Sequence, residues 1–596
     1  MEIAFDRFMN LLNAVNEVLW ADWVLFVLLG VGVLFTIWSG FSQFRALTHG
    51  AAVVRGKYDD KDDPGAINHF QALSTALSAT VGLGNIAGVA LAVQVGGPGA
   101  VFWMWVTGLI GMALKLTEVT QAMLYRDTED PDNPRGGAMW VCKRGFAAIH
   151  PSLKWLGVVV GAVFCVTLLI SAVTGGNMFQ SWNVADISFA YFGVPQYATG
   201  VILTVAVGVV IIGGIRRIGD VASRVVPLMC GLYILASLYI IAVNLGEIPR
   251  MFALIFREAF SPSEAGGAFL GGVAGYGFLV GMQRALFSSE AGQGSAPIAH
   301  SAAKTDEPVR EGVVAGLEPF IDTIVVCTIT ALVILLSGTW NRDPALRFAA
   351  EPPRFALVAD EQGIPSPSRD GEHRFAAEPV PVVVADAEEA RGQMRAGQKV
   401  FLVLDGGENA TTGGSRHKLV GALEQGEGGS WLASFPEFTH PSPEPPSIAA
   451  DGVYFDFNGA TLTAKAFDTT LPGLGIWIVP AAVWLFAFST IISWSYYGEQ
   501  GAIYLFGTRS VVPYRVLYCL CVLLSCLPFI NAGHIENISV LGTGVMLWAN
   551  IPIMLIFGPI AMKAYHDYIR RLKSGELDRT AHKPAPLKDV IEGRDV

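Results

Sequence analysis

Long apolar segments alternate with short polar ones along most of this chain. A helix needs about 20 apolar residues to cross a bilayer, and we predict about eleven such helices. Their approximate bounds are 22–43, 69–95, 100–124, 155–179, 197–215, 224–244, 267–290, 312–338, 473–505, 513–530 and 536–562. The composition, 52% hydrophobic and only 15% charged residues, is also typical of membrane proteins with many spans. We therefore predict an all-α polytopic membrane protein, interrupted by one polar stretch at about 340–470.

Lysine and arginine predict the orientation of these helices. With the N-terminus outside, the inner loops and C-terminal tail carry about 25 of these residues and the short outer segments about 3. We expect an inner-membrane protein with its N-terminus and the 340–470 stretch outside and its C-terminus in the cytoplasm. The N-terminus lacks the basic start and cleavage site of a removable signal peptide, so the first helix should be retained.

Glycines interrupt the second apolar segment at its middle, in SATVGLGNIAGVA, residues 78–90. Gly82, Gly84 and Gly88 weaken a helix, and free backbone groups are tolerated inside a bilayer only where they line a cavity or an ion site. Thr80 and Asn85 add polar side chains at the same depth. The segment predicts a broken helix that binds a solute and a cation, and a glycine-rich packing face is the alternative.

Five predicted spans precede residue 260 and five follow it, if the first is set aside. Five is odd, so the two halves have opposite orientations, as in an inverted repeat. Each half begins with a glycine-broken segment, and the second is GGAFLGGVAGYG, residues 266–277. The expected units are 1–68 (N-terminal segment and peripheral membrane helix), 69–260 (first repeat), 261–338 (start of the second repeat), 339–472 (insertion), 473–565 (rest of the second repeat) and 566–596 (cytoplasmic tail).

The insertion predicts a small, mostly β domain outside the membrane. Proline-rich runs separate strand-like pieces at 380–385, 399–406 and 452–467, the last with a hairpin signal at Asn458-Gly459. An NAT triplet at 409–411 matches a glycosylation acceptor, although an ordinary polar loop explains it better. None of the seven cysteines lies in this stretch, and their spacing indicates neither a disulfide framework nor a zinc site.

Five motifs resemble the alanine or glycine:cation symporter family. They are SATVGLGNIAGVA (78–90), GGPGAVFWMW (96–105), GMALKLTEVTQAMLYR (111–126), RALFSSEAGQGSAPIAH (284–300) and FAFSTIISWSYYGEQ (486–500). The resemblance covers 20–338 and 473–565. It implies a 5+5 inverted-repeat core of the amino acid–polyamine–cation type and sodium-driven import of small neutral amino acids. The insertion is atypical of the family, Ala138 replaces a usual proline, and Trp182 stands where an asparagine is usual.

An amino acid at midplane needs partners for both of its charges. A broken helix offers N–H groups to the carboxylate and carbonyls to the ammonium. We assign the carboxylate to backbone at Gly82–Asn85 with Gln180 as a side-chain donor, and the ammonium to carbonyls near Gly272 and Gly275. The alternative for Gln180 is an interhelical hydrogen bond. Trp494 is predicted to cap the pocket, with a core position as its alternative.

Sodium needs hard oxygen ligands. The family resemblance favours carbonyls near Thr80 and Val81, together with the hydroxyls of Ser489 and Thr490. Adjacent hydroxyls in a span often bond back to their own helix instead. A proton is the alternative coupling ion.

Ionisable residues within spans are costly and usually functional or paired. Lys115 and Glu118 are three residues apart, which favours a structural pair over a gating or proton role. Glu290 and Glu499 lie near inner span ends, where Arg284 or other loop bases would complete a cytoplasmic gate.

These features predict a secondary symporter for alanine or glycine that works by alternating access, with no enzymatic activity and no nucleic-acid partner. The alternatives are a transporter-like receptor whose insertion binds an external partner, and a symporter of another small solute. Nothing in the sequence indicates an oligomeric state.

Overall fold

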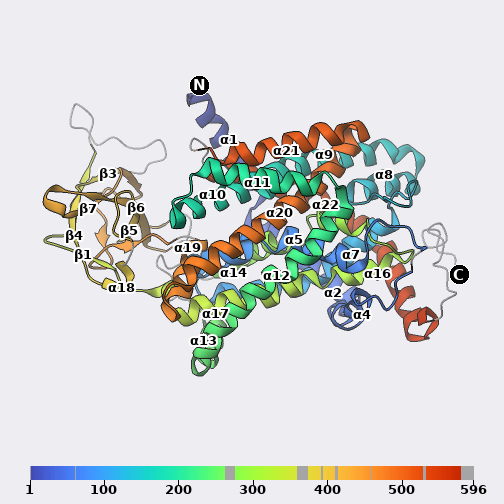
Figure 1. Cartoon of the computed structure of the whole chain (residues 1–596), viewed down its shortest axis with the longest axis horizontal. Helices are drawn as coiled ribbons and strands as arrows, with labels where there is room; N and C mark the ends of the chain where they lie inside the picture. The colour runs from blue at the N-terminus through green and yellow to red at the C-terminus, as the bar shows by residue number, and fades with distance from the viewer. Residues whose placement is uncertain are drawn as a thin grey trace.

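A computed structural model describes residues 2–60, 62–261, 276–358, 373–390, 393–409, 414–457, 459–527 and 532–578. It has two parts, a bundle of long helices and a smaller β-rich region at one end of the bundle (Figure 1). The C-terminal end of α22, drawn in red, lies at the opposite end of the bundle.

Helices make up the larger part. They are α1 Glu2–Leu19, α2 Asp22–Trp38, α3 Ser42–Arg45, α4 Ala51–Val54, α5 His69–Thr80, α6 Val89–Gly96, α7 Gly99–Leu124, α8 Ala138–Ile149, α9 Lys154–Val173, α10 Phe179–Phe192, α11 Gln196–Ile211, α12 Gly214–Val243, α13 Ile248–Ala259, α14 Tyr276–Ser289, α15 Ala296–His300, α16 Pro308–Ala315, α17 Thr328–Ser337, α18 Ala387–Ala390, α19 Ala460–Thr470, α20 Leu474–Phe506, α21 Val511–Ser525 and α22 Ala532–Lys573. Turns of π-helix lie at Ala46–Gly50, Gly84–Gly88, Thr174–Met178 and Phe320–Cys327. Such turns are rare in proteins overall, and those that occur are often found at functional sites.

Seven helices within the described residues are long and apolar enough to cross a membrane, and a bent pair makes an eighth if it is one span. The seven are Leu11–Trp38, Gly99–Leu124, Pro151–Phe192, Gly214–Val243, Pro308–Ser337, Leu474–Phe506 and Asn537–Lys573. The predicted spans at 197–215 and 513–530 correspond to the shorter helices α11 and α21. The span at 267–290 lies partly outside the described residues. The count of about eleven therefore stays a prediction, as does the inverted repeat.

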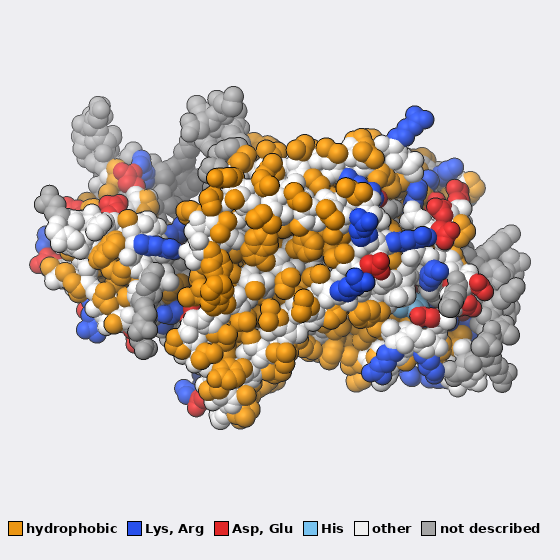
Figure 2. Space-filling model, viewed as in Figure 1, with side chains coloured by type: hydrophobic (Ala, Val, Ile, Leu, Met, Phe, Trp, Pro, Cys, Tyr) orange, Lys and Arg blue, Asp and Glu red, His pale blue; other side chains and the backbone are white. Residues whose placement is uncertain are grey.

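The surface of the helical part is apolar around its middle. Figure 2 shows hydrophobic side chains covering the central part of the bundle, with most charged side chains at its right-hand end and on the β-rich region. Leu235, Ile212 and Val205 are among the exposed apolar residues on this surface. A large exposed apolar belt between charged ends is what a lipid-facing surface requires.

The β-rich region coincides with the predicted insertion. Its strands are β1 Leu346–Phe348, β2 Phe355–Leu357, β3 His373–Ala377, β4 Val380–Val384, β5 Lys399–Asp405, β6 Arg416–Gln425, β7 Trp431–Ser434, β8 Phe438–His440, β9 Ser447–Ile448 and β10 Tyr454–Phe455. One antiparallel sheet has the order β1-β4-β7-β6-β5-β10, with β9 also pairing with β5, and a second has the order β2-β3-β8. The predicted strands at 380–385 and 399–406 are confirmed as β4 and β5.

The predicted strand pair across 452–467 is wrong. Among the described residues of this stretch, Tyr454–Phe455 alone forms a strand, and Ala460–Thr470 is helix α19. The helix buries Leu462 with Ala466 and Thr463 with Phe467, pairs four residues apart on one face, against α17 and α20. The same residues also alternate in polarity, so packing against the bundle decides between helix and strand. Asn458 of the supposed turn lies outside the described residues.

Helix α19 packs closely against α20, and we predict that this contact tolerates no added methyl group. A Cβ at Gly475 would lie 2.0 Å from the backbone oxygen of Ala464. Gly475→Ala should therefore destabilise the protein by about 1–3 kcal/mol, as overpacking does. Gly231→Ala in α12 is the control, because nothing lies within 4 Å of its Cβ position. Thermal unfolding in detergent measures both, and equal midpoints would contradict the close contact.

Candidate functional site

Helix α5 ends inside the protein rather than at its surface. It begins with a capping box at Asn68 and Gln71, and it ends at Thr80, which is buried. Beyond a short non-helical stretch, a π-helical turn at Gly84–Gly88 leads into α6, and the two halves are bent by 52°. The predicted break in the helix is therefore confirmed.

Asn85 holds the break against neighbouring elements. Its side-chain oxygen accepts the Gly82 N–H at 2.9 Å. Its amide donates to Ser288 Oγ at 2.7 Å and to the backbone oxygen of Asp322 at 3.0 Å. Asn85, Ser288 and Asp322 are all fully buried. Asn85 thus joins the break to α14 and to the π-helical turn Phe320–Cys327, in addition to any contact with a solute.

Oxygen atoms gather where α5 ends against α20. The Ser78 hydroxyl donates to the backbone oxygen of Ser489 at 3.0 Å and contacts the Ser493 hydroxyl. Thr490 Oγ1 donates to the Ser78 backbone oxygen at 3.0 Å, and Ser489 Oγ lies 3.5 Å from the same oxygen. All four residues are buried. We call Ser78, Ser489, Thr490 and Ser493 the oxygen cluster.

The structure brings together only part of the predicted cation ligands. Ser489 and Thr490 lie at the end of α5, and a Cβ at Gly82 would lie 2.9 Å from Thr490 Oγ1. The Thr80 hydroxyl instead faces its own helix, 3.3 Å from the Ala76 oxygen. Val81, the residue after α5, is fully buried.

Sequence reasoning missed Ser78 and Ser493. The spacing of four residues from Ser489 to Ser493 places both hydroxyls on one face of α20, which was a usable signal. Ser78 belongs to the same motif as the glycines of the break, and its position one turn before them also pointed to this cluster.

Gln180 and Trp494 lie beside a second π-helical turn, Thr174–Met178. The Gln180 amide donates to the Gly175 oxygen at 3.1 Å, while its own side-chain oxygen is buried and has no partner among the described residues. A Cβ at Gly176 would lie 2.3 Å from the Trp494 ring. The absence of a side chain at Gly176 therefore makes room for the indole. Trp494 follows Thr490 by four residues, on the same face of α20.

The remaining predicted solute contacts are placed only in part. Gly84 lies against Ser288, with its Cβ position 3.6 Å from Ser288 Cα. Gly272 and Gly275, with most of the segment 266–277, lie outside the described residues. Trp182 is half-buried in α10.

Several charged side chains are buried within the helical part. Lys115 Nζ lies 3.9 Å from Glu118, the predicted pair, but only 3.3 Å from Glu318. Glu290 accepts a hydrogen bond from Ser295 at 2.5 Å. Glu499 receives two bonds from the Arg515 guanidinium, at 2.6 and 3.0 Å, which gives it a base as predicted.

The chain matches known proteins over most of its length. The model of the Sodium:alanine symporter family matches residues 5–351 and 448–583, which leaves out most of the β-rich region. The sodium/alanine symporter AgcS of Methanococcus maripaludis is 34% identical over 513 residues, covering 86% of this chain and 87% of AgcS. The putative sodium/proton-dependent alanine carrier protein YrbD of Bacillus subtilis is 30% identical over 568 residues, covering 94% and 93%.

A solved structure is also similar, that of MhsT in complex with L-phenylalanine. The TM-score is 0.44 and the identity 13%, over 89% of this chain and 99% of that one. The family assignment rests on the sequence matches. Together with the apolar helices, they show a multi-pass membrane transporter rather than an enzyme, and this chain belongs to the sodium:alanine symporter family.

Proposed function

We propose that this protein imports a small neutral amino acid, alanine or glycine, together with sodium by alternating access. The observation that carries the proposal is the break after α5, where the helix ends inside the protein beside a cluster of oxygens. Two kinds of ligand suit such a place, a carboxylate at N–H groups and a hard cation at oxygens. An amino acid and sodium supply both.

The proposed solute site lies between the break and the turn at Thr174–Met178. Backbone N–H groups around Gly82–Asn85 would bind the carboxylate, with the Gln180 amide, which also donates to Gly175, as a side-chain donor. The buried side-chain oxygen of Gln180 has no partner among the described residues, so it is free to accept a hydrogen bond from a solute ammonium. The indole of Trp494, packed on Gly176, would limit the size of the solute side chain.

The oxygen cluster fits sodium in its chemistry. Hydroxyl and carbonyl oxygens are hard ligands, and this cluster supplies them from two helices without a carboxylate. Ser489, Thr490 and the backbone oxygens of Ser78 and Val81 would hold the ion. A bound cation there would join the end of α5 to α20, and so would favour one arrangement of the two helices over the other.

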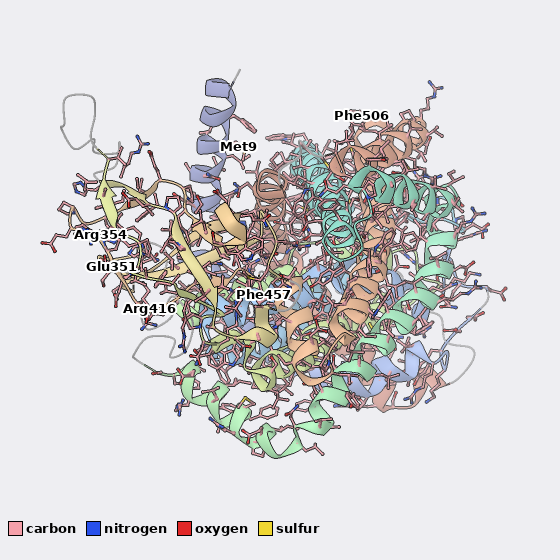
Figure 3. The ribbon with its side chains drawn as sticks, turned by 60° about the vertical axis from the view of Figure 1, so that its left-hand side comes forward. Met9, Glu351, Arg354, Arg416, Phe457 and Phe506 are labelled. Carbon is pink, nitrogen blue, oxygen red and sulfur yellow. The ribbon has the colours of Figure 1, made fainter. Side chains whose placement is uncertain are left out.

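We further propose the orientation predicted from the charges, with the β-rich region outside and the C-terminus in the cytoplasm. The arrangement supports it, because the β-rich region and the end of α22 lie at opposite ends of the bundle. In Figure 3, Glu351, Arg354 and Arg416 lie on the β-rich region, whereas Phe457 lies closer to the helices. The proposed units and the inverted repeat keep the bounds given above.

Uptake into proteoliposomes tests the proposed function. Labelled alanine or glycine should accumulate when sodium is higher outside, and not when choline replaces sodium on both sides. Inhibition of this labelled uptake by a series of unlabelled amino acids then defines the solute class. Failure to transport any small neutral amino acid under a sodium or a proton gradient would overturn the proposal.

Thr490→Val should weaken sodium binding. The substitution preserves the shape of the side chain but removes an oxygen, and the loss of one such interaction should raise the half-saturating sodium concentration about tenfold or more. Ser495→Ala is the matched control, because that hydroxyl on the same helix bonds only to Ile492, at 2.6 Å, among the described residues. Sodium-dependent uptake measures both, and equal shifts would argue against an ion at the cluster.

Labelling of introduced cysteines tests the orientation. Glu351 is 78% exposed on the β-rich region. In a cysteine-free background, Glu351→Cys should react with a membrane-impermeant maleimide in intact cells. Ser574→Cys, at the end of α22, should react only after the membrane is opened. The reverse pattern would contradict the proposed topology.

A further inference from the structure

Six ionisable side chains form a continuous chain inside the protein. From the surface inward they are His69, Glu311, His300, Glu318, Lys115 and Glu118. Each contacts the next, bases and acids alternate, and all are at most 2% exposed. They come from five places in the chain, α5, α7, α15, α16 and the segment after α16. We call these six residues the buried relay.

The two contacts of His300, at the centre of the relay, need one more proton than a neutral imidazole supplies. Its Nδ1 lies 2.6 Å from Glu311 Oε1, and its Nε2 lies 2.6 Å from Glu318 Oε1. A carboxylate can only accept a hydrogen bond, and a neutral imidazole has only one N–H. Both contacts therefore require an additional proton, on the imidazole or on one carboxyl group. That proton can be shared in either direction along the relay.

One end of the relay approaches solution. His69 Nδ1 bonds to the second oxygen of Glu311. Its Nε2 faces Asp59 across 3.9 Å and makes no hydrogen bond within the described residues, and Asp59 is 46% exposed. Asp59 thus brings an exposed carboxylate close to the outermost histidine of the relay. Asp59 lies in the loop before α5, which the charge pattern places on the cytoplasmic side.

The other end of the relay lies in the C-terminal half of α7. Lys115 Nζ faces Glu318 at 3.3 Å and Glu118 at 3.9 Å, without a well-formed hydrogen bond to either in the described part of the chain. Glu118 is held from its other side by the Gly294 N–H at 3.2 Å and by Asn550 at 3.0 Å. Because Lys115 makes no well-formed hydrogen bond to either carboxylate among the described residues, its side chain can change partners.

The relay also continues toward the proposed solute site. Glu290 acts electrostatically on Lys115 and interacts with the side chain of Trp494. Trp494 is the residue proposed to limit the solute. A change of charge at Lys115 therefore acts on Glu290, which interacts with the residue proposed to limit the solute.

The surroundings of the relay contain an excess of carboxylates. The charged and titratable groups that face it from neighbouring elements are Asp59, Glu290, Asp322, Arg126 and Tyr497. Arg126 donates to the backbone oxygens of Ser301 and Ala303, and its burial lowers its pKa to about 10, so it remains a cation at neutral pH. The relay itself contains three basic and three acidic side chains, so each buried acid has a base beside it.

We propose that the buried relay carries a proton between Lys115 and the solution near Asp59, and that the protein co-transports this proton with its amino acid. Each transfer breaks one N–H or O–H bond and forms another on the next group. A proton that leaves His69 for water is replaced at Lys115 while the central site is open to the opposite solution. The proposal rests on the proposed function, since it adds a proton to that transport cycle.

Wild-type protein in proteoliposomes gives the first test. A pH-sensitive dye is trapped inside, the starting pH is equal on both sides, and a sodium gradient drives alanine uptake. The interior should become more acidic in step with uptake, by about one proton per alanine. Uptake without acidification, or with alkalinisation, would overturn the relay while leaving sodium-coupled transport intact. Absence of uptake would instead contradict the proposed function.

Two variants locate the path. His300→Gln and His69→Gln should lower the ratio of protons to alanine at least fivefold, whatever the remaining rate of uptake. His150→Gln, at an exposed histidine bonded only to Ser152 among the described residues, is the matched control and should keep the wild-type ratio. An unchanged ratio in either relay variant would overturn the path.

A variant that does not transport is still informative. Its proton uptake from weakly buffered detergent solution is measured during a downward step in pH, with the solubilised wild type beside it. The relay variant should bind fewer protons than wild type over the same step. Equal proton uptake by the two proteins would contradict the proposal.

Discussion

The arrangement depends on one constraint, that backbone groups freed inside an apolar protein must find partners. Helix α5 ends at Thr80 within the bundle, and its last carbonyls and the N–H groups that follow have no further helical turn to bond to. Water cannot satisfy them at this depth. The surrounding elements therefore supply polar side chains: Asn85 from the break itself, and Ser489 and Thr490 from α20.

The hydrogen bonds within the protein leave some of the polar groups at the break able to bind a ligand. Asn85 uses both amide protons on Ser288 and Asp322, so it serves mainly to fix the geometry of the break. The oxygen cluster, by contrast, consists of hydroxyls and carbonyls with acceptor capacity left over. A site that is rigid on one side and short of ligands on the other suits a small solute and a cation, and its two halves belong to different helices.

Much of this could be predicted from the sequence. Glycine spacing located the break, and the charge pattern gave an orientation that the separation of the β-rich region from the end of α22 supports. The helix α19 could not be predicted, because its polarity pattern fits a strand equally well and its packing on α20 decides. Lys115 was expected to pair with Glu118, three residues away; its closer partner Glu318 comes from a distant segment, and no local pattern reveals such a contact.

The buried relay and the break occupy the same bundle, and Glu290 interacts both with Lys115 of the relay and with Trp494. The central claim is nevertheless the two-part site at the break. A structure determined with alanine and sodium tests it most directly. The account predicts the alanine carboxylate at the N–H groups of Gly82–Asn85 and a sodium ion within the oxygen cluster. Alanine density against the β-rich region, with the break and the cluster empty, would contradict it.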